Sequence, residues 1–197
     1  PKDKDFLRSL DDLLSRKGDF ETLASIYRRV VESDPEDMNA HARLSNYYIK
    51  LGLLKEALEM NQRIIDAERA TATTYRRMAY ITGQLGDFEK RVSNLNKALK
   101  IDKGNDSIII DLAKTYEQAG KKKKALAIYK SAAATAKDKE ILIPVIEDAL
   151  NNKKYKDAQT VLKRYVSYYP KDKNAYAQLG MIMGKLGDTK AQITYYK

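Results

Sequence analysis

The residues that could perform chemistry are few in this chain, and their spacing matches no catalytic or metal-binding pattern. The 197 residues include one histidine, His41, and no cysteine, which excludes disulfides and thiolate metal sites. Since a catalytic or metal-binding histidine would need partners that are absent, His41 is interpreted as a packing residue. Neighbouring carboxylates, Asp11 with Asp12 and Glu147 with Asp148, are typical of solvated helices. The sequence therefore predicts no enzyme, no metal site and no cofactor.

The nearest approach to a phosphate-binding loop is the segment 180–185, Gly-Met-Ile-Met-Gly-Lys. It has one residue too few between its glycines, and Leu186 follows where a Ser or Thr would bind magnesium. Gly180 also fills a small-residue position of the repeat described next. The segment is therefore interpreted as structural.

Glycines recur along the chain with a fixed period. Gly18, Gly52, Gly86 and Gly120 are 34 residues apart, and Gly187 follows after 67 residues, one unit being 33 residues long. Between them, apolar residues recur at i, i+3, i+4 and i+7, which is the spacing of amphipathic helices. A period of this length is typical of stacked-repeat proteins, in which each unit buries its apolar face against its neighbours. It predicts about twelve helices, paired across the five glycine turns and an equivalent turn at Lys153.

The repeat resembles that of the tetratricopeptide family. The fourth repeat carries the pattern in its small, aromatic and turn positions, Leu112-Ala113, Tyr116, Gly120, Ala125, Tyr129 and Ala132. The resemblance implies an all-α, right-handed superhelical solenoid of stacked antiparallel helix pairs, formed by residues 1–197 as a single domain. Its six repeats are expected near 4–37, 38–71, 72–105, 106–138, 139–172 and 173–197, the last one truncated.

In this family the first helix of each repeat lines a concave surface that meets extended peptides. The positions off the packing stripe imply groove residues Arg8, Asn46, Arg76, Tyr80, Ile110, Lys114 and Met181. The favoured hypothesis is a non-catalytic scaffold that binds a protein or peptide there, as part of a larger bacterial assembly, secretion or envelope protein. Some family members hold a carboxylate in a clamp, whose positions read Arg8, Asp12, Arg43, Thr73 and Arg77 here. Only the cationic ends match, and Asp12 would repel a carboxylate, which argues against that use.

Net charge provides the alternative hypothesis. Residues 1–99 carry 17 Lys and Arg against 16 Asp and Glu, whereas residues 100–197 carry 20 against 11. Stacked turns of neighbouring repeats would align a basic ridge that could bind a polyanion or nucleic acid. Its members are Lys121, Lys122, Lys123, Lys124, Lys153, Lys154 and Lys156. Arginine, the usual choice for bidentate phosphate contacts, occurs only once in this half, so nucleic acid is the less favoured partner.

Several positions depart from the repeat. Arg91 and Gln192 replace a small alanine and Asn61 replaces an aromatic residue, so looser packing of those helix pairs is expected. Pro144 falls inside a first helix, which should begin late or kink there.

The last repeat stops halfway along its second helix, so Ile193 and Tyr196 should be partly exposed, or covered by another chain, and the natural protein is expected to continue. No apolar run approaches the roughly 18 residues that span a bilayer. Cytoplasmic and periplasmic locations both remain open.

Overall fold

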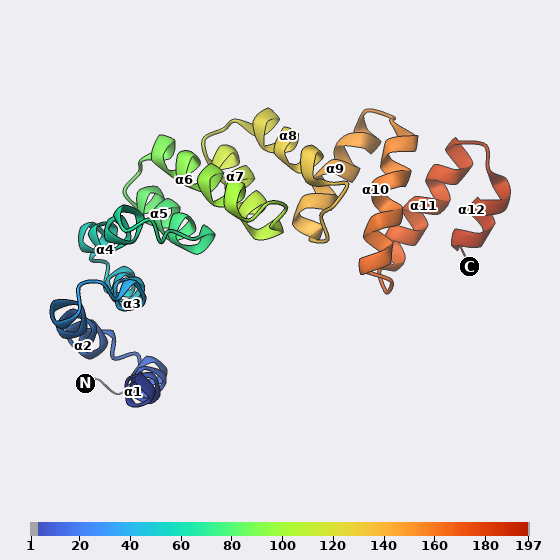
Figure 1. Ribbon diagram of the computed structural model, residues 1–197. Helices are drawn as coiled ribbons and strands as arrows, with labels where there is room; N and C mark the ends of the chain where they lie inside the picture. The colour runs from blue at the N-terminus through green and yellow to red at the C-terminus, as the bar shows by residue number, and fades with distance from the viewer. Residues whose placement is uncertain (1–3, 197) are drawn as a thin grey trace. The chain divides into compact units, whose positions relative to one another are not determined.

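The residues that the structure describes form twelve α-helices (Figure 1). The structure, a computed structural model, describes residues 4–196, and only the backbone of Lys4 and Tyr196. The described residues contain no strand. The helices are α1 (Lys4–Lys17), α2 (Phe20–Ser33), α3 (Met38–Lys50), α4 (Leu54–Asp66), α5 (Ala72–Gln84), α6 (Phe88–Ile101), α7 (Asp106–Gln118), α8 (Lys122–Ala132), α9 (Lys139–Asn151), α10 (Tyr155–Tyr168), α11 (Lys173–Lys185) and α12 (Thr189–Tyr196). The prediction of an all-α chain with about twelve helices is confirmed.

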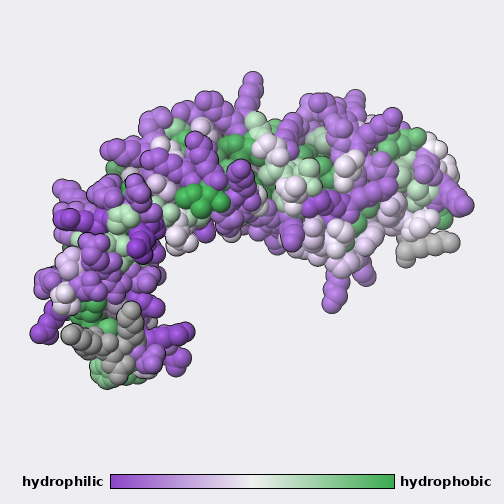
Figure 2. All heavy atoms as spheres, in the orientation of Figure 1, coloured by the Kyte–Doolittle hydropathy of each residue, from purple (hydrophilic) through white to green (hydrophobic). Residues whose placement is uncertain are grey.

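Consecutive helices pack as pairs within two compact units. Unit 1, Pro1–Ile101, holds the pairs α1–α2, α3–α4 and α5–α6, and unit 2, Asp102–Lys197, holds α7–α8, α9–α10 and α11–α12. The core of unit 1 combines small residues, such as Ala57, with large ones, such as Leu23 and Leu44. In Figure 2 the side that is visible is mostly hydrophilic, with apolar side chains in small separate groups. That one solenoid extends over residues 1–197 stays a prediction.

The turns inside the pairs use left-handed backbone. The five periodic glycines have φ between 72° and 82°, a region that side chains disfavour by about 1–2 kcal/mol. Lys153 occupies the corresponding turn between α9 and α10 and adopts the same region, with φ of 57°. The predicted sixth turn is therefore confirmed, at a residue that is poorly suited to it.

Helix α9 does not begin late, so that part of the expectation for Pro144 is wrong. The helix begins at Lys139, where the Asp138 carboxylate accepts a bond of 2.9 Å from the Glu140 amide. Ile141 is fully buried in the first turn and anchors it. The hydrogen bond that a proline at 144 removes would reach the carbonyl of Glu140, an exposed residue, so solvent can satisfy that oxygen.

The expected loose packing at Arg91 and Gln192 is also wrong, because a glycine faces each of them. A Cβ at Gly83 would lie 2.8 Å from Cδ of Arg91, and one at Gly184 would lie 2.8 Å from Nε2 of Gln192. The long side chain on the second helix thus fills the space above a glycine on the first helix. The larger residue of each pair therefore stands on the second helix and the small one on the first.

Asn61 is likewise closely packed, through hydrogen bonds in place of an aromatic ring. It is fully buried in α4, and its Nδ2 donates to Oγ of Ser45 and, at 2.7 Å, to the carbonyl of Ala57. Its Oδ1 accepts a bond of 3.2 Å from Arg77 on α5. A polar bridge therefore links three successive helices of unit 1.

The end of the last helix agrees with expectation where it is described. Ile193 of α12 is 53% exposed, as predicted. The side chain of Tyr196, for which exposure was also predicted, lies outside the described residues.

Candidate functional site

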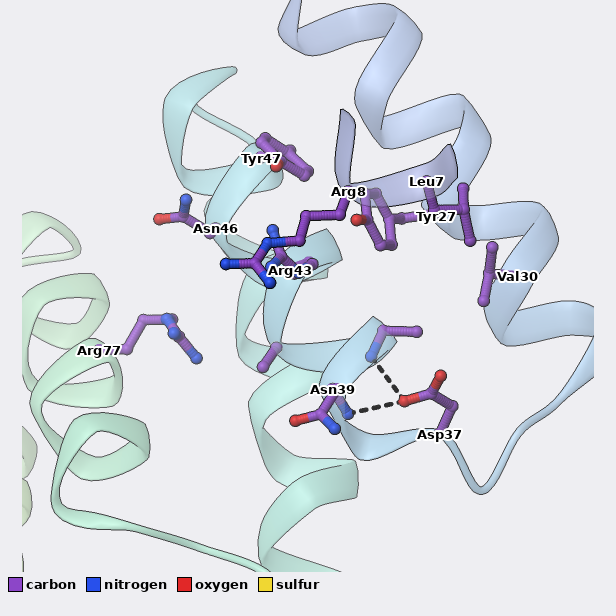
Figure 3. A pocket seen from close by; sticks show the side chains of 12 residues that line it. Leu7, Arg8, Tyr27, Val30, Asp37, Asn39, Arg43, Asn46, Tyr47 and Arg77 are labelled. Atoms are coloured by element: carbon purple, nitrogen blue, oxygen red, sulfur yellow. Dashed lines mark hydrogen bonds between the residues drawn. The ribbon is translucent and has the colours of Figure 1, made fainter. Parts of the chain in front are cut away.

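A pocket of about 560 Å³ lies on the first-helix side of unit 1, between α1, α3 and α5 (Figure 3). Arg8 comes from α1, Arg43 and Asn46 from α3, and Arg77 from α5. The lining residues are Leu7, Arg8, Tyr27, Val30, Asp37, Asn39, Ala40, Ala42, Arg43, Asn46, Tyr47 and Arg77. Two of the predicted groove residues, Arg8 and Asn46, are thereby brought into one pocket.

The pocket is strongly basic. Figure 3 shows the side chains of Arg8 and Arg43 reaching into the same space, with Arg77 facing them from α5. The one carboxylate among the lining residues, Asp37, is occupied as the cap of α3, where it accepts bonds of 3.0 Å from the amides of Asn39 and Ala40. Asp12, whose charge argued against an anionic ligand, is not among the lining residues. The arrangement can bind a carboxylate or another small anion.

A buried carboxylate, Asp11, fixes Arg43 in place. Asp11 is only 4% exposed and accepts hydrogen bonds from Tyr27 at 2.7 Å, from Ser15 at 3.2 Å, from Tyr47 and from Arg43. Its interpretation as one of a solvated pair is therefore wrong. Burial alone would raise the pKa of Asp11, but the hydrogen bonds and the charge of Arg43 outweigh burial and lower the pKa below 3.8. Arg43 is thus half-exposed at the pocket, and its guanidinium is positioned by the ionised carboxylate of Asp11.

Arg77 is held by an amide and not by an acid. Its only hydrogen bond among the described residues goes to Asn61, and no described carboxylate pairs with it. Burial lowers the pKa of Arg77 because it disfavours the charged form. An arginine nonetheless stays charged in proteins, so this guanidinium has lost hydration without gaining a counter-ion. An anionic ligand would supply the counter-ion that Arg77 lacks among the described residues.

The other predicted groove residues lie in different surroundings. Arg76 and Tyr80 are on α5 outside the pocket, Arg76 half-buried and Tyr80 51% exposed. In unit 2, Ile110 is buried, Lys114 pairs with Glu140, and Met181 is 41% exposed.

Unit 2 has a smaller and more apolar pocket on its own first-helix side. It measures about 140 Å³ and lies between α9, α10 and α11, with Ile143, Ile146 and Leu150 among its lining residues. Glu147 and Gln178 bring polar groups to it. Ile143 and Glu147 of α9 are both exposed. The first helices of unit 2 therefore present an apolar recess, whereas those of unit 1 present arginines.

The lysines of the predicted ridge are all exposed. Lys121 occupies the N-cap of α8 and Lys154 that of α10, and neither side chain makes a capping hydrogen bond. The first turn of α8 contains no acidic residue, so Lys122, Lys123 and Lys124 add positive charge to the positive end of the helix. Lys124 lies over the ring of Tyr116 at 5.8 Å.

The remaining candidates for chemistry have structural surroundings. His41 is buried, and its Nε2 lies 2.9 Å from the carbonyl of Pro35, which confirms a packing residue. Within residues 4–196 no group of three or more His, Asp or Glu side chains could hold a metal ion. None of the helices described there has the length and hydropathy needed to cross a membrane.

Comparison with known proteins agrees with this architecture. Two tetratricopeptide repeat models match the chain, one over residues 12–72 and one over residues 84–142, together more than half of it. The chain is 22% identical over 191 residues to the Hsp70-Hsp90 organizing protein 1 of Glycine max, a match covering 87% of this chain and 31% of that protein. It therefore spans about a third of the length of that curated relative.

Solved structures share the fold at low identity. One is YrrB, described as a TPR protein with an unusual peptide-binding site, at 16% identity and a TM-score of 0.55, covering 87% of this chain and 89% of that chain. Another is PilW, described as a widely conserved type IV pilus biogenesis factor, at 17% identity and a TM-score of 0.57, covering 97% of this chain and 89% of that chain.

Proposed function

Because the chain belongs to the tetratricopeptide repeat family, we propose that it is a non-catalytic scaffold that binds an extended segment of a partner protein on its first helices. In unit 1 the segment presents a carboxylate to Arg8, Arg43 and Arg77. In unit 2 an apolar side chain enters the recess at Ile143 and Ile146. The partner is thus an acidic segment that also carries apolar residues.

The observation that carries this proposal is the set of three guanidinium groups around one pocket with no free lining carboxylate. Like charges at such a site repel one another, and a bound anion reverses that repulsion. At an effective dielectric of about 20, one charge pair at 4 Å is worth roughly 4 kcal/mol before desolvation is subtracted. A carboxylate in this pocket would meet more than one such partner, so it would contribute measurably even after that cost.

The setting that we propose is a bacterial assembly, secretion or envelope machine. The description of PilW as a pilus biogenesis factor supports this setting only through the shared fold. The competing hypothesis, polyanion binding by the ridge lysines, is supported by their exposure and by the uncapped start of α8.

Peptide selection separates these hypotheses. A random-sequence peptide library displayed on phage is selected on the chain, and the affinity of enriched peptides is measured by fluorescence anisotropy. Acidic peptides should be enriched, and Arg77→Met or Arg8→Gln should weaken them about tenfold, the effect of losing about 1.4 kcal/mol. Arg63→Gln on α4, an exposed arginine outside the pocket, is the matched control and should change nothing.

A second measurement addresses the ridge. A labelled single-stranded DNA is titrated at rising salt against the chain and against a variant with all seven ridge lysines changed to Gln. Tight binding that falls steeply with salt and is lost in the lysine variant would favour the ridge over the pocket, since neutralised phosphates release counter-ions.

A further inference from the structure

A second groove lies on the other helices of unit 1, away from the arginine pocket. It has a volume of about 720 Å³ and runs between α4 and α6, with α5 contributing to its lining. Leu58, Met78 and Leu85 supply apolar surface, and Lys55 and Lys97 are among its charged residues. Nothing in the proposed function uses this groove.

One polar residue of the groove, Asn94 on α6, has no hydrogen-bond partner. The residue is 7% exposed, and none of the hydrogen bonds found within residues 4–196 involves its side chain. The other buried polar side chains, Asp11, His41, Ser45, Asn61, Thr74, Thr82 and Thr115, each make at least one hydrogen bond. Among the described residues, His41 Nδ1 is the buried side-chain atom that lacks a partner, so the amide atoms of Asn94 are still reached by solvent in the groove. An amide without a partner in the fold, at the surface of a groove, is open to pair with a ligand.

The chain's own repeats show that an asparagine is not needed there for folding. Asn94 stands eight residues after its turn glycine. The corresponding residues of the other five repeats are apolar or aromatic: Ile26, Met60, Ile128, Val161 and Tyr195. The third repeat has therefore exchanged a packing residue for an amide that the fold itself leaves unpaired.

We propose that this groove binds the backbone of an extended, apolar segment of a partner protein, with Asn94 pairing to one of its peptide groups. A carboxamide offers N–H donors beside a carbonyl acceptor, which is the complement of the C=O and N–H of a peptide group. The peptide groups of a helix are already bonded to one another, so an extended segment fits and a helix does not. Its apolar side chains would lie on Leu58, Met78 and Leu85.

The charges around the groove favour a peptide over a polyanion. Lys90 is paired with Asp87 at 2.9 Å, and Lys97 lies over the ring of Tyr75 at 5.5 Å. Glu59 also lines the groove and offsets Lys55. The groove is thus nearly balanced in charge, and its excess of one lysine tolerates an acidic residue at the edge of the bound segment.

The test is an NMR titration of the ¹⁵N-labelled chain with a defined probe, the peptide acetyl-Leu-Glu-Leu-Glu-Leu-amide. The side-chain amide signals of Asn94 and the backbone signals of Leu58 and Leu85 should shift together. The same peptide with an N-methylated central leucine lacks the backbone donor and should bind about tenfold more weakly.

Variants separate binding from folding. Asn94→Ile, which copies the residue of other repeats, should weaken the probe about tenfold while the melting temperature stays level or rises. Asn94→Asp keeps the size and the acceptor but loses the donor, and should also weaken binding. Asn96→Ile changes an exposed asparagine of the same helix and is the matched control, with unchanged binding expected.

Four results would overturn the proposal. They are the absence of any shift at millimolar peptide, shifts confined to the arginine pocket, equal binding by Asn94→Ile, and a clearly lower melting temperature of Asn94→Ile. The last would show that Asn94 serves the fold.

Discussion

Placing a large residue at Gly83 and a small one at Arg91 tests how the two helices of a pair pack against each other. In α3–α4 the corresponding residues are Ile49 and Ala57, and in α9–α10 they are Leu150 and Ala158. The third repeat reverses the order, with glycine on the first helix and a long side chain on the second. We therefore expect Gly83→Leu and Arg91→Ala to be harmful singly and compatible together.

The magnitudes follow from the contact at Gly83. A Cβ there would lie 2.8 Å from Cδ and 3.1 Å from Nε of Arg91, closer than side-chain atoms normally approach. Overpacking of this kind costs about 1–3 kcal/mol, and a leucine, which adds three further carbons, should reach the upper end. Leucine has a higher helix propensity than glycine, which stabilises the helix by somewhat less than about 1 kcal/mol. The net loss for Gly83→Leu is about 2 kcal/mol.

Arg91→Ala alone should cost about 1–2 kcal/mol, because its alkyl stem no longer covers Gly83. The double variant copies the pairing of α3–α4 and α9–α10 and should unfold with nearly the free energy of the original chain. The resulting coupling energy is about 3 kcal/mol, at the upper end of the range for residues in contact.

Urea unfolding followed by far-UV circular dichroism gives the free energy of unfolding of the original chain, the two single variants and the double variant. The pair Gly184 and Gln192 in α11–α12 offers an independent repetition, since a Cβ at Gly184 meets Gln192 at the same 2.8 Å. Losses that simply add, with a coupling below about 0.5 kcal/mol, would refute the size-exchange argument.

Three further predictions concern the turns and the buried acid, each measured by urea unfolding. Lys153→Gly should stabilise the chain by about 1 kcal/mol because glycine tolerates the positive φ there, whereas Lys153→Ala should not; equal effects would count against a backbone origin. Lys121→Asp should add about 1 kcal/mol by capping α8, as Asp87 caps α6 through its bond to the Lys90 amide, and Lys121→Ala, which removes the charge but offers no cap, should add clearly less. Asp11→Asn should cost about 1–3 kcal/mol at pH 7. Because the folded pKa of Asp11 is lowered, its stabilisation is present above the ordinary value of 3.8 and lost as the pH falls through the folded pKa, so this variant should lose less stability below pH 4 than the original chain does.

The helices and turns could be predicted because they depend on local features with a fixed period. A glycine at each turn has a positive φ, and the apolar stripe that follows determines which side of the helix is buried. Even the turn at Lys153 could be placed by counting from its neighbours. The start of α9 does not follow from Pro144 alone, because the Asp138 cap and the buried Ile141 together hold the first turn.

The arginine pocket could be predicted only in part. Arg8 and Asn46 follow from the repeat, whereas the burial of Asp11 does not follow from its neighbour Asp12, because two adjacent acids are usually solvated. Counting from the turn indicates this burial. Asp11 stands seven residues before Gly18, where the later repeats have the buried Ala79, Ala113 and Gly180. Its partners Tyr27, Arg43 and Tyr47 are 16 to 36 residues away, so no local pattern could have assigned them.

Two departures from the repeat in unit 1, at Asn61 and Asn94, border the two candidate sites. Asn61, where an aromatic residue is expected, holds Arg77 at the arginine pocket. Asn94, where the other repeats have apolar or aromatic residues, lines the second groove without a partner. Sequences that specify a fold well tend to break their own pattern where function requires it. Both exchanges replace packing surface by an amide, and only the one at Asn61 is satisfied within the chain. Asn61 therefore supports the proposed arginine pocket from behind, whereas Asn94 is proposed to meet a ligand directly.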